Sequence, residues 1–145
     1  MQTMTTAIVQ KMLGSTKANL AEADANAEIK TFIPLTDTPT FPVHRLGDYQ
    51  MHCRPGSRLN DILGDEFTVR YNHRFHLEPK LKPDLEKFGL HISGTDATGK
   101  IADGIEFTHH PFYLGVQGHP ELSSLRVKPH PLLTAFLKAA GSKRS

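Results

Sequence analysis

Residues 114–121 read Leu-Gly-Val-Gln-Gly-His-Pro-Glu, an apolar strand followed by a loop that carries a histidine and a glutamate. His119 and Glu121 are two residues apart, and side chains at this spacing on an extended chain point to the same side. Pro120 between them fixes one backbone angle. A histidine and a carboxylate held together form the base and the orienting group of a nucleophilic triad. The spacing predicts that His119 accepts a proton from a nucleophile while Glu121 holds its ring, although a solvated surface loop can carry the same residues.

Composition places the chain among ordinary globular domains. Its 145 residues suffice for one domain with a hydrophobic core. The formal charge of +2 gives no reason to expect nucleic acid or a membrane surface as a partner. No apolar run approaches the ~20 residues that span a bilayer, and the N-terminus lacks a signal-peptide pattern. The single cysteine cannot form an internal disulfide, which predicts a reducing, cytoplasmic setting.

Helix and strand patterns alternate along the chain. Helices are predicted at 3–13, 59–63, 84–88 and 131–140. Strands are predicted at 27–35, 43–54, 67–77, 90–93, 100–107 and 111–117, with loops at 18–24 and 36–42 and a hairpin turn at 96–99. This order predicts an α/β domain whose first strands are missing. It also leaves the first helix without an obvious parallel sheet to cover.

Two further residues could take part in chemistry. Cys53 is the only thiol, but it lies in a predicted strand and not at a strand-to-helix turn, so a structural role is favoured over that of a nucleophile. Arg74 lies on a predicted strand. If that strand lies near the His–Glu pair, its guanidinium is suited to bind a carboxylate through two hydrogen bonds.

The count of nine histidines raises the question of a metal site. His109 and His110 are adjacent and seldom ligate one ion together. His73 and His76 are three apart, which places their side chains on opposite faces of a strand. No metal is therefore expected.

Several short segments together resemble the C-terminal half of the class I glutamine amidotransferase domain of CTP synthase. In the family's order they are Arg45-Leu46-Gly47, Cys53-Arg54 with Pro55-Gly56-Ser57, His73-Arg74-Phe75, Gly115-Val116-Gln117 with His119-Pro120-Glu121, and Lys128-Pro129-His130-Pro131-Leu132. The resemblance implies a partial amidotransferase domain over residues 1–140, with a flavodoxin-like α/β fold that lacks the N-terminal strands of the sheet. Residues 141–145 are expected to form a flexible tail.

The resemblance also implies where the chain lies within that domain. Met1-Gln2 matches the end of the family's Gly-x-Cys-Leu-Gly-Met-Gln nucleophile elbow, and Ala18-Asn19 with Glu22 matches its Ala-Asn-Ser-Thr-Glu. The chain is thus expected to begin just after the nucleophilic cysteine. The synthetase domain, which uses ATP and Mg, would also lie upstream.

Site roles are implied residue by residue. His119 would be the general base and Glu121 its orienting group, while Gln2, Glu22 and Arg74 would contact L-glutamine, Arg74 through the substrate carboxylate. The family hydrolyses glutamine and uses the ammonia, with ATP, to aminate UTP to CTP. This chain would need no cofactor of its own and would be inactive alone, because the nucleophile is missing. Its partners would be L-glutamine and the synthetase domain, with a homo-oligomer expected only for the full-length protein.

The sequence departs from the family pattern at some positions. Gly118 stands where the family has a large aromatic residue, His76 stands where a glutamate is usual, and Leu20-Ala21 replaces Ser-Thr before Glu22. Two alternatives stay open, motivated by the first helix without an obvious sheet and by the high histidine count. One is a non-catalytic amidotransferase-like remnant or partner-binding regulatory module, and the other is a histidine-rich metal module.

Overall fold

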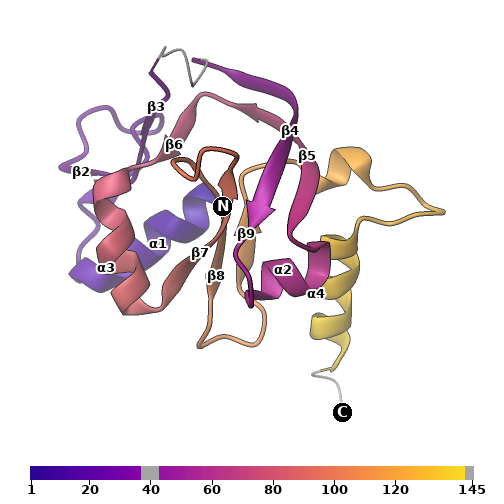
Figure 1. Cartoon of the computed structure of the whole chain (residues 1–145). Helices are drawn as coiled ribbons and strands as arrows, with labels where there is room; N and C mark the ends of the chain where they lie inside the picture. The colour runs from indigo at the N-terminus through magenta and orange to yellow at the C-terminus, as the bar shows by residue number, and fades with distance from the viewer. Residues whose placement is uncertain (37–42, 143–145) are drawn as a thin grey trace.

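Five antiparallel strands form the central sheet, in the order β5-β4-β7-β8-β9 (Figure 1). The computed structural model describes residues 1–36 and 43–142. The strands are β4 (Arg45–Cys53), β5 (Glu66–His73), β7 (Leu90–Asp96), β8 (Ala102–Phe107) and β9 (Leu114–Val116). Two small sheets accompany them, formed by β1 (Ala18–Asn19) with β2 (Ile29–Lys30) and by β3 (Phe32–Pro34) with β6 (Phe75–Leu77). The domain is a mixed α/β structure with a curled sheet.

Helices α1 (Gln2–Leu13) and α3 (Lys82–Phe88) cover one side of this sheet (Figure 1). The cluster buried there consists of Ile8, Val9, Ala18, Phe32, Leu77, Leu85, Leu90, Ala102 and Ile105. Full burial of one large aliphatic side chain contributes about 1.5–3 kcal/mol. The first helix was expected to lack an obvious parallel sheet to cover, and it packs instead on the antiparallel strands β7 and β8 through Leu90 and Ile105.

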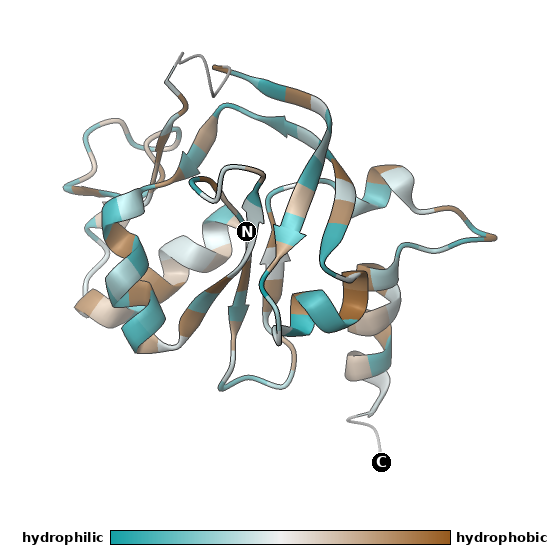
Figure 2. Cartoon of the chain, viewed as in Figure 1, coloured by the Kyte–Doolittle hydropathy of each residue, from teal (hydrophilic) through white to brown (hydrophobic). Residues whose placement is uncertain are grey.

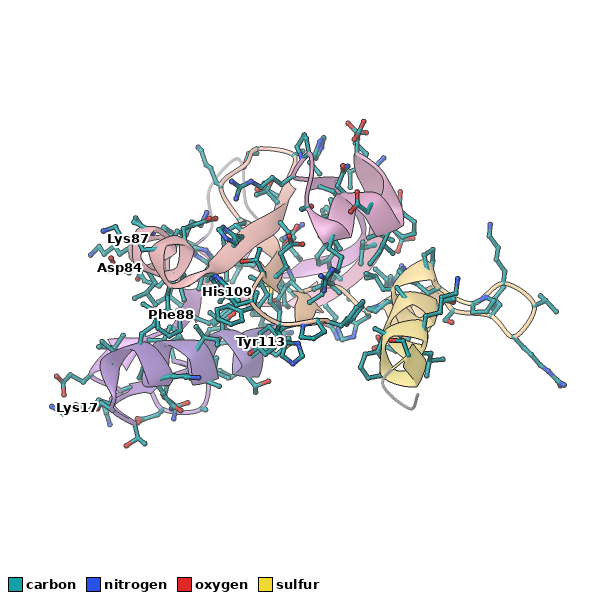
Figure 3. The ribbon with its side chains drawn as sticks, turned by 90° about the horizontal axis from the view of Figure 1, so that it is seen from below. Lys17, Asp84, Lys87, Phe88, His109 and Tyr113 are labelled. Carbon is teal, nitrogen blue, oxygen red and sulfur yellow. The ribbon has the colours of Figure 1, made fainter. Side chains whose placement is uncertain are left out.

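Aromatic side chains fill the space between α3 and α1. Phe88, His109 and Tyr113 lie between these helices in Figure 3. The ring of Phe107 contacts all three, at centroid distances of 6.2, 5.5 and 6.0 Å. The Tyr113 hydroxyl donates a hydrogen bond to the carbonyl oxygen of Met4 at 2.9 Å. His109 therefore packs as one ring of an aromatic cluster.

Helices α2 (Arg58–Leu63) and α4 (Pro131–Gly141) lie on the other side of the sheet (Figure 1). They enclose a second cluster of Met51, Cys53, Leu59, Val69, Tyr71 and Leu132. The loop between the 3₁₀ turn η2 (Pro120–Ser123) and α4 projects from the domain and carries hydrophobic residues (Figure 2). Val127 on this loop is 92% exposed. No helix in the described ranges combines the length and apolar character needed to cross a membrane.

The predicted helices and strands occur in the structure, but several differ from it in extent, as where β7 continues to Asp96 beyond the strand predicted at 90–93. The strand predicted at 27–35 is split into β2 and β3, and the strand at 67–77 breaks at Arg74 into β5 and β6. The loop predicted at 18–24 contains β1, and only residues Leu114–Val116 of the strand predicted at 111–117 pair in the sheet. Residues 37–42 of the predicted loop and 143–145 of the predicted tail lie outside the described residues, and Gly141 is the last residue of α4.

Candidate active site

A pocket of about 290 Å³ opens where the N-terminus of α1, the β5–β6 turn and the loop after β9 meet. Its lining residues are Gln2, Glu22, Asn72, His73, Arg74, Phe75, Gln117 and His119. The structure thus brings together four of the five residues singled out from the sequence. The fifth, Glu121, reaches the site through its contact with His119.

Backbone hydrogen bonds attach the His119 loop to the sheet. The N–H of Gln117 donates to the carbonyl oxygen of Asp103 on β8 at 2.8 Å. Two residues later the N–H of His119 donates to the carbonyl oxygen of Arg70 on β5 at 2.8 Å. The loop therefore crosses from one edge of the sheet to the other, and this crossing carries His119 from β9 to the pocket beside the end of β5.

His119 and Glu121 form a direct pair. The Nδ1 atom of His119 lies 2.7 Å from Oε1 of Glu121, and the two side chains are 39% and 59% exposed. Slight burial acts to raise the pKa of Glu121, but hydrogen bonds from its own backbone and from His119 lower it below the ordinary value. Because an ionised carboxylate only accepts hydrogen bonds, Nδ1 carries a proton, and in the neutral form of the ring the lone pair is then on Nε2. This is the arrangement of a general base and its orienting carboxylate.

Opposite charges line the same pocket. Arg74 lies between β5 and β6 with an exposed side chain, and its carbonyl oxygen accepts a hydrogen bond from the N–H of Leu35 at 2.8 Å. Glu22 is also exposed. Among the described residues, neither side chain forms an ion pair. A free guanidinium and a free carboxylate in one pocket suit the carboxylate and ammonium groups of an amino acid.

Sequence reasoning missed a buried polar network behind the pocket. Arg45 donates two hydrogen bonds to Asp103, at 2.7 and 3.0 Å, and a third contact of 3.2 Å joins it to His73. The hydroxyl of Tyr71 donates to Asp103 at 3.0 Å. The signal was present in the sequence, because Asp103 interrupts an apolar strand at a core-facing position, but its partner lies 58 residues away along the chain.

Cys53 is remote from this chemistry. It is 5% exposed, and burial, assisted by the charge of Asp65, raises its pKa to about 11. It lines a different pocket, whose residues are His52, Cys53, Arg54, Pro55, Ile92, Ser93, Gly94 and Thr95. A buried, protonated thiol is a poor nucleophile. Over residues 1–36 and 43–142, no three His, Cys, Asp or Glu side chains gather as metal ligands.

Comparison with known proteins identifies similar sequences over most of the chain. Residues 1–139 match the family described as glutamine amidotransferase class-I. The CTP synthase of Rhodospirillum centenum is 42% identical over 97 residues, which cover 66% of this chain and 18% of that protein. The CTP synthase of Roseiflexus castenholzii is 36% identical over 146 residues, covering 97% of this chain and 26% of that protein. The chain thus spans about a quarter or less of the length of these relatives.

Solved structures share the fold. The glutaminase domain of the Trypanosoma brucei CTP synthase, solved with bound acivicin, superposes with a TM-score of 0.87 at 24% identity and covers 97% of this chain and 57% of that one. A Thermoplasma acidophilum protein named for GMP synthase gives a TM-score of 0.57 at 18% identity, covering 78% of this chain and 49% of that one. At these identities the likeness establishes the fold.

Proposed function

The chain belongs to the class I glutamine amidotransferase family, and we propose that it forms the glutamine-binding part of the ammonia-supplying domain of a CTP synthase. One observation carries the proposal: Gln2, Glu22, Arg74 and His119, which lie far apart in the sequence, line a single pocket. The names of the curated relatives support the assignment to CTP synthase. The bound acivicin in the similarly folded glutaminase domain supports a small-molecule site in this fold.

Each pocket residue has a chemical task. Arg74 binds the α-carboxylate of L-glutamine, which a planar guanidinium can hold through two hydrogen bonds. Glu22 pairs with the α-ammonium group, and Gln2 contacts the substrate with its side-chain amide. This pairing of charges orients the substrate amide toward His119. Arg74 and Glu22 are exposed, so both charges stay hydrated while the pocket is empty. Holding them there costs little free energy, and both are available to bind the ligand.

His119 serves as the proton carrier of the reaction. Its Nε2 atom takes the proton of a cysteine thiol, whose sulfur attacks the carbonyl carbon of the glutamine side chain. The carbon–nitrogen bond breaks as His119 returns the proton to the leaving nitrogen, which departs as ammonia. Water then hydrolyses the glutamyl thioester to glutamate. Glu121 stabilises the imidazolium that forms between the two proton transfers.

The thiol in this scheme is not Cys53, which is buried, has a raised pKa and lines another pocket. These 145 residues contain no other cysteine. By themselves they should therefore bind glutamine without hydrolysing it. In the whole protein, the ammonia would aminate UTP to CTP with ATP in the synthetase domain.

Titration with L-glutamine, followed by calorimetry or amide NMR shifts, tests the proposal. Binding should be lost in Arg74→Ala and kept in the matched control Arg70→Ala, an exposed arginine of the preceding strand β5 that pairs with Asp48. A ligand without the carboxylate, 4-aminobutanamide, should bind the wild type more weakly and bind Arg74→Ala equally weakly. If Arg74→Ala and Arg70→Ala bind L-glutamine alike, the assignment of Arg74 is wrong.

The buried single thiol also favours a second candidate, a non-catalytic partner-binding module derived from an amidotransferase. That module predicts no response to L-glutamine in the same titration. An ammonia-release assay tests a remaining possibility, that these residues hydrolyse glutamine with their own thiol. Ammonia formation that disappears in Cys53→Ser would contradict both candidates, because it would make Cys53 the nucleophile.

A further inference from the structure

His73, the residue before Arg74, is buried in the wall of the pocket and uses both ring nitrogens. It is 6% exposed. Its Nδ1 atom lies 2.8 Å from the carbonyl oxygen of Phe75, and its Nε2 atom lies 3.2 Å from Nη1 of Arg45. A carbonyl oxygen only accepts and a guanidinium only donates, so Nδ1 carries the hydrogen and Nε2 accepts. The two partners therefore specify a neutral ring in one tautomer.

The partner on the Nε2 side is itself fixed. Arg45 forms a two-point pair with the fully buried Asp103, which also accepts a hydrogen bond from Tyr71. The Arg45 guanidinium lies 4.3 Å from the centroid of the Tyr71 ring. Burial acts to lower the pKa of Arg45, but the hydrogen bonds and charge of Asp103 raise it, so Arg45 remains a cation. A fully satisfied buried network of this kind is rigid.

The partner on the Nδ1 side belongs to the turn that presents Arg74. His73 ends β5 and Phe75 begins β6, so the hydrogen bond from His73 Nδ1–H to the Phe75 carbonyl spans Arg74. From the other side, the N–H of Leu35 donates to the carbonyl oxygen of Arg74 at 2.8 Å. The backbone of Arg74 is therefore held on both sides, while its side chain stays exposed to the pocket.

We propose that His73 is a positioning residue for the carboxylate-binding Arg74, a role that rests on the proposed glutamine site. Its imidazole transmits the position of the buried Arg45–Asp103 pair to the β5–β6 turn through the Phe75 carbonyl. The residue does not touch the reacting atoms. It affects the affinity for L-glutamine because it fixes the position of the Arg74 backbone and so of its guanidinium.

The neutral state of the ring agrees with this geometry. Burial lowers the pKa of His73 to about 4, the hydrogen bond to Phe75 opposes this shift, and the charge of Arg45 adds to it. A positive charge on His76 or His44 would lower the pKa of His73 further, in the same direction as the charge of Arg45. Near neutral pH the Nε2 lone pair is thus available to Arg45.

Two substitutions separate the two hydrogen bonds of His73. In His73→Asn the side-chain amide nitrogen takes the place of Nδ1 and can still donate to the Phe75 carbonyl. In His73→Gln the amide reaches the place of Nε2, and the donor to Phe75 is lost. Both variants remove the ring, so a purely structural role predicts equal effects on binding.

We expect the two variants to differ in their Kd for L-glutamine. His73→Asn should keep the Kd within about threefold of wild type, and His73→Gln should raise it by at least about tenfold, the size of one lost positioning contact. Equal weakening in both variants, or no weakening in either, would overturn the role of His73 while leaving the glutamine site intact. A wild-type chain that does not bind L-glutamine would reject the proposed function itself.

Arg70→Ala is the matched control, because it removes an exposed side chain of the same strand, which pairs with Asp48, and keeps both hydrogen bonds of His73. It should bind L-glutamine as wild type does. If His73→Gln does not fold, the ¹⁵N chemical shifts of the His73 ring in the wild type test the inference instead. An Nδ1–H tautomer at neutral pH supports the inference, and an Nε2–H tautomer or an imidazolium would overturn it.

Discussion

A Cβ atom added at Gly118 would collide with Cγ1 of Val69 and lie 3.1 Å from the carbonyl oxygen of Arg70. The N–H of His119 donates to this same carbonyl at 2.8 Å. The missing side chain at position 118 therefore lets the loop of the proposed base lie directly on β5. The large aromatic residue expected here from the family pattern could not occupy this position without moving Val69.

Gly118→Ala should destabilise the fold by about 1–3 kcal/mol, the cost of overpacking a filled site. The β-branched Val69 has little rotamer freedom to move away. Val69→Ala introduced into the same chain should recover part of this loss, because it removes the colliding methyl group. Urea denaturation of wild type, both single variants and the double variant measures the coupling, expected at about 0.5–3 kcal/mol. Strictly additive effects would contradict a clash between these two residues.

Sequence reasoning could foresee the parts of the site that depend on local spacing. The pairing of His119 with Glu121 was predicted from their two-residue spacing on an extended chain. The structure has them 2.7 Å apart, but Glu121 lies in the 3₁₀ turn η2 and not on an extended segment. Their catalytic roles stay predictions. The Arg45–Asp103 pair and the two hydrogen bonds of His73 could not be foreseen, because they depend on the register of strands that are distant in the sequence.

At the scale of elements, helix α4 begins with an unusual cap. His130 precedes Pro131, and its Nδ1 atom accepts a hydrogen bond from the N–H of Leu132 at 3.2 Å. The ring is 4% exposed and packs edge-on against Phe67, at a centroid distance of 5.2 Å. Pro131 in the first turn predicts where this helix starts, but histidine is not among the preferred capping residues. The sequence therefore predicted the helix and not its cap.

His130→Ala should lower the free energy of unfolding by about 2 kcal/mol, the upper range for a lost N-cap, because the variant also removes a buried ring. His130→Asn should cost less, since asparagine caps through its side-chain oxygen. Thermal unfolding followed by circular dichroism compares the two variants. Equal losses would mean that packing on Phe67, and not the cap, holds the start of α4.

Where the structure splits a predicted strand, tertiary contacts override the pattern. The aromatic and β-branched run continues through Phe75 and Leu77, so nothing local marks a break at Arg74. The break arises because β5 pairs with β4 whereas β6 pairs with β3. The strand predicted at 111–117 is shorter for a related reason, because only residues Leu114–Val116 pair with β8.

For the molecule as a whole, buried histidines link stability to pH. Burial lowers the pKa of His73 to about 4 and lowers the pKa values of His76 and His130 below their ordinary range. In the unfolded chain these groups regain ordinary values near 6.5. Below that pH the unfolded state binds more protons than the folded state, so protonation favours unfolding. The stabilising contribution is complete above about pH 6.5 and decreases as the pH falls toward 4.

His73 alone should therefore make the fold about 2 kcal/mol less stable at pH 5 than at pH 7, given the shift of its pKa from 6.5 to about 4. Urea denaturation at both pH values measures the total. His76 and His130 add to it in the same direction, and Asp103, whose pKa is raised by burial, adds in the opposite direction. His73→Asn, which cannot titrate, should reduce the pH dependence by about that amount, whereas Arg70→Ala, a change to an exposed residue paired with Asp48, should leave it unchanged. If His73→Asn retains the full pH dependence of the wild type, the ring of His73 is not the group that titrates. The hydrogen bond from Arg45 to Nε2 would then not keep the His73 ring neutral.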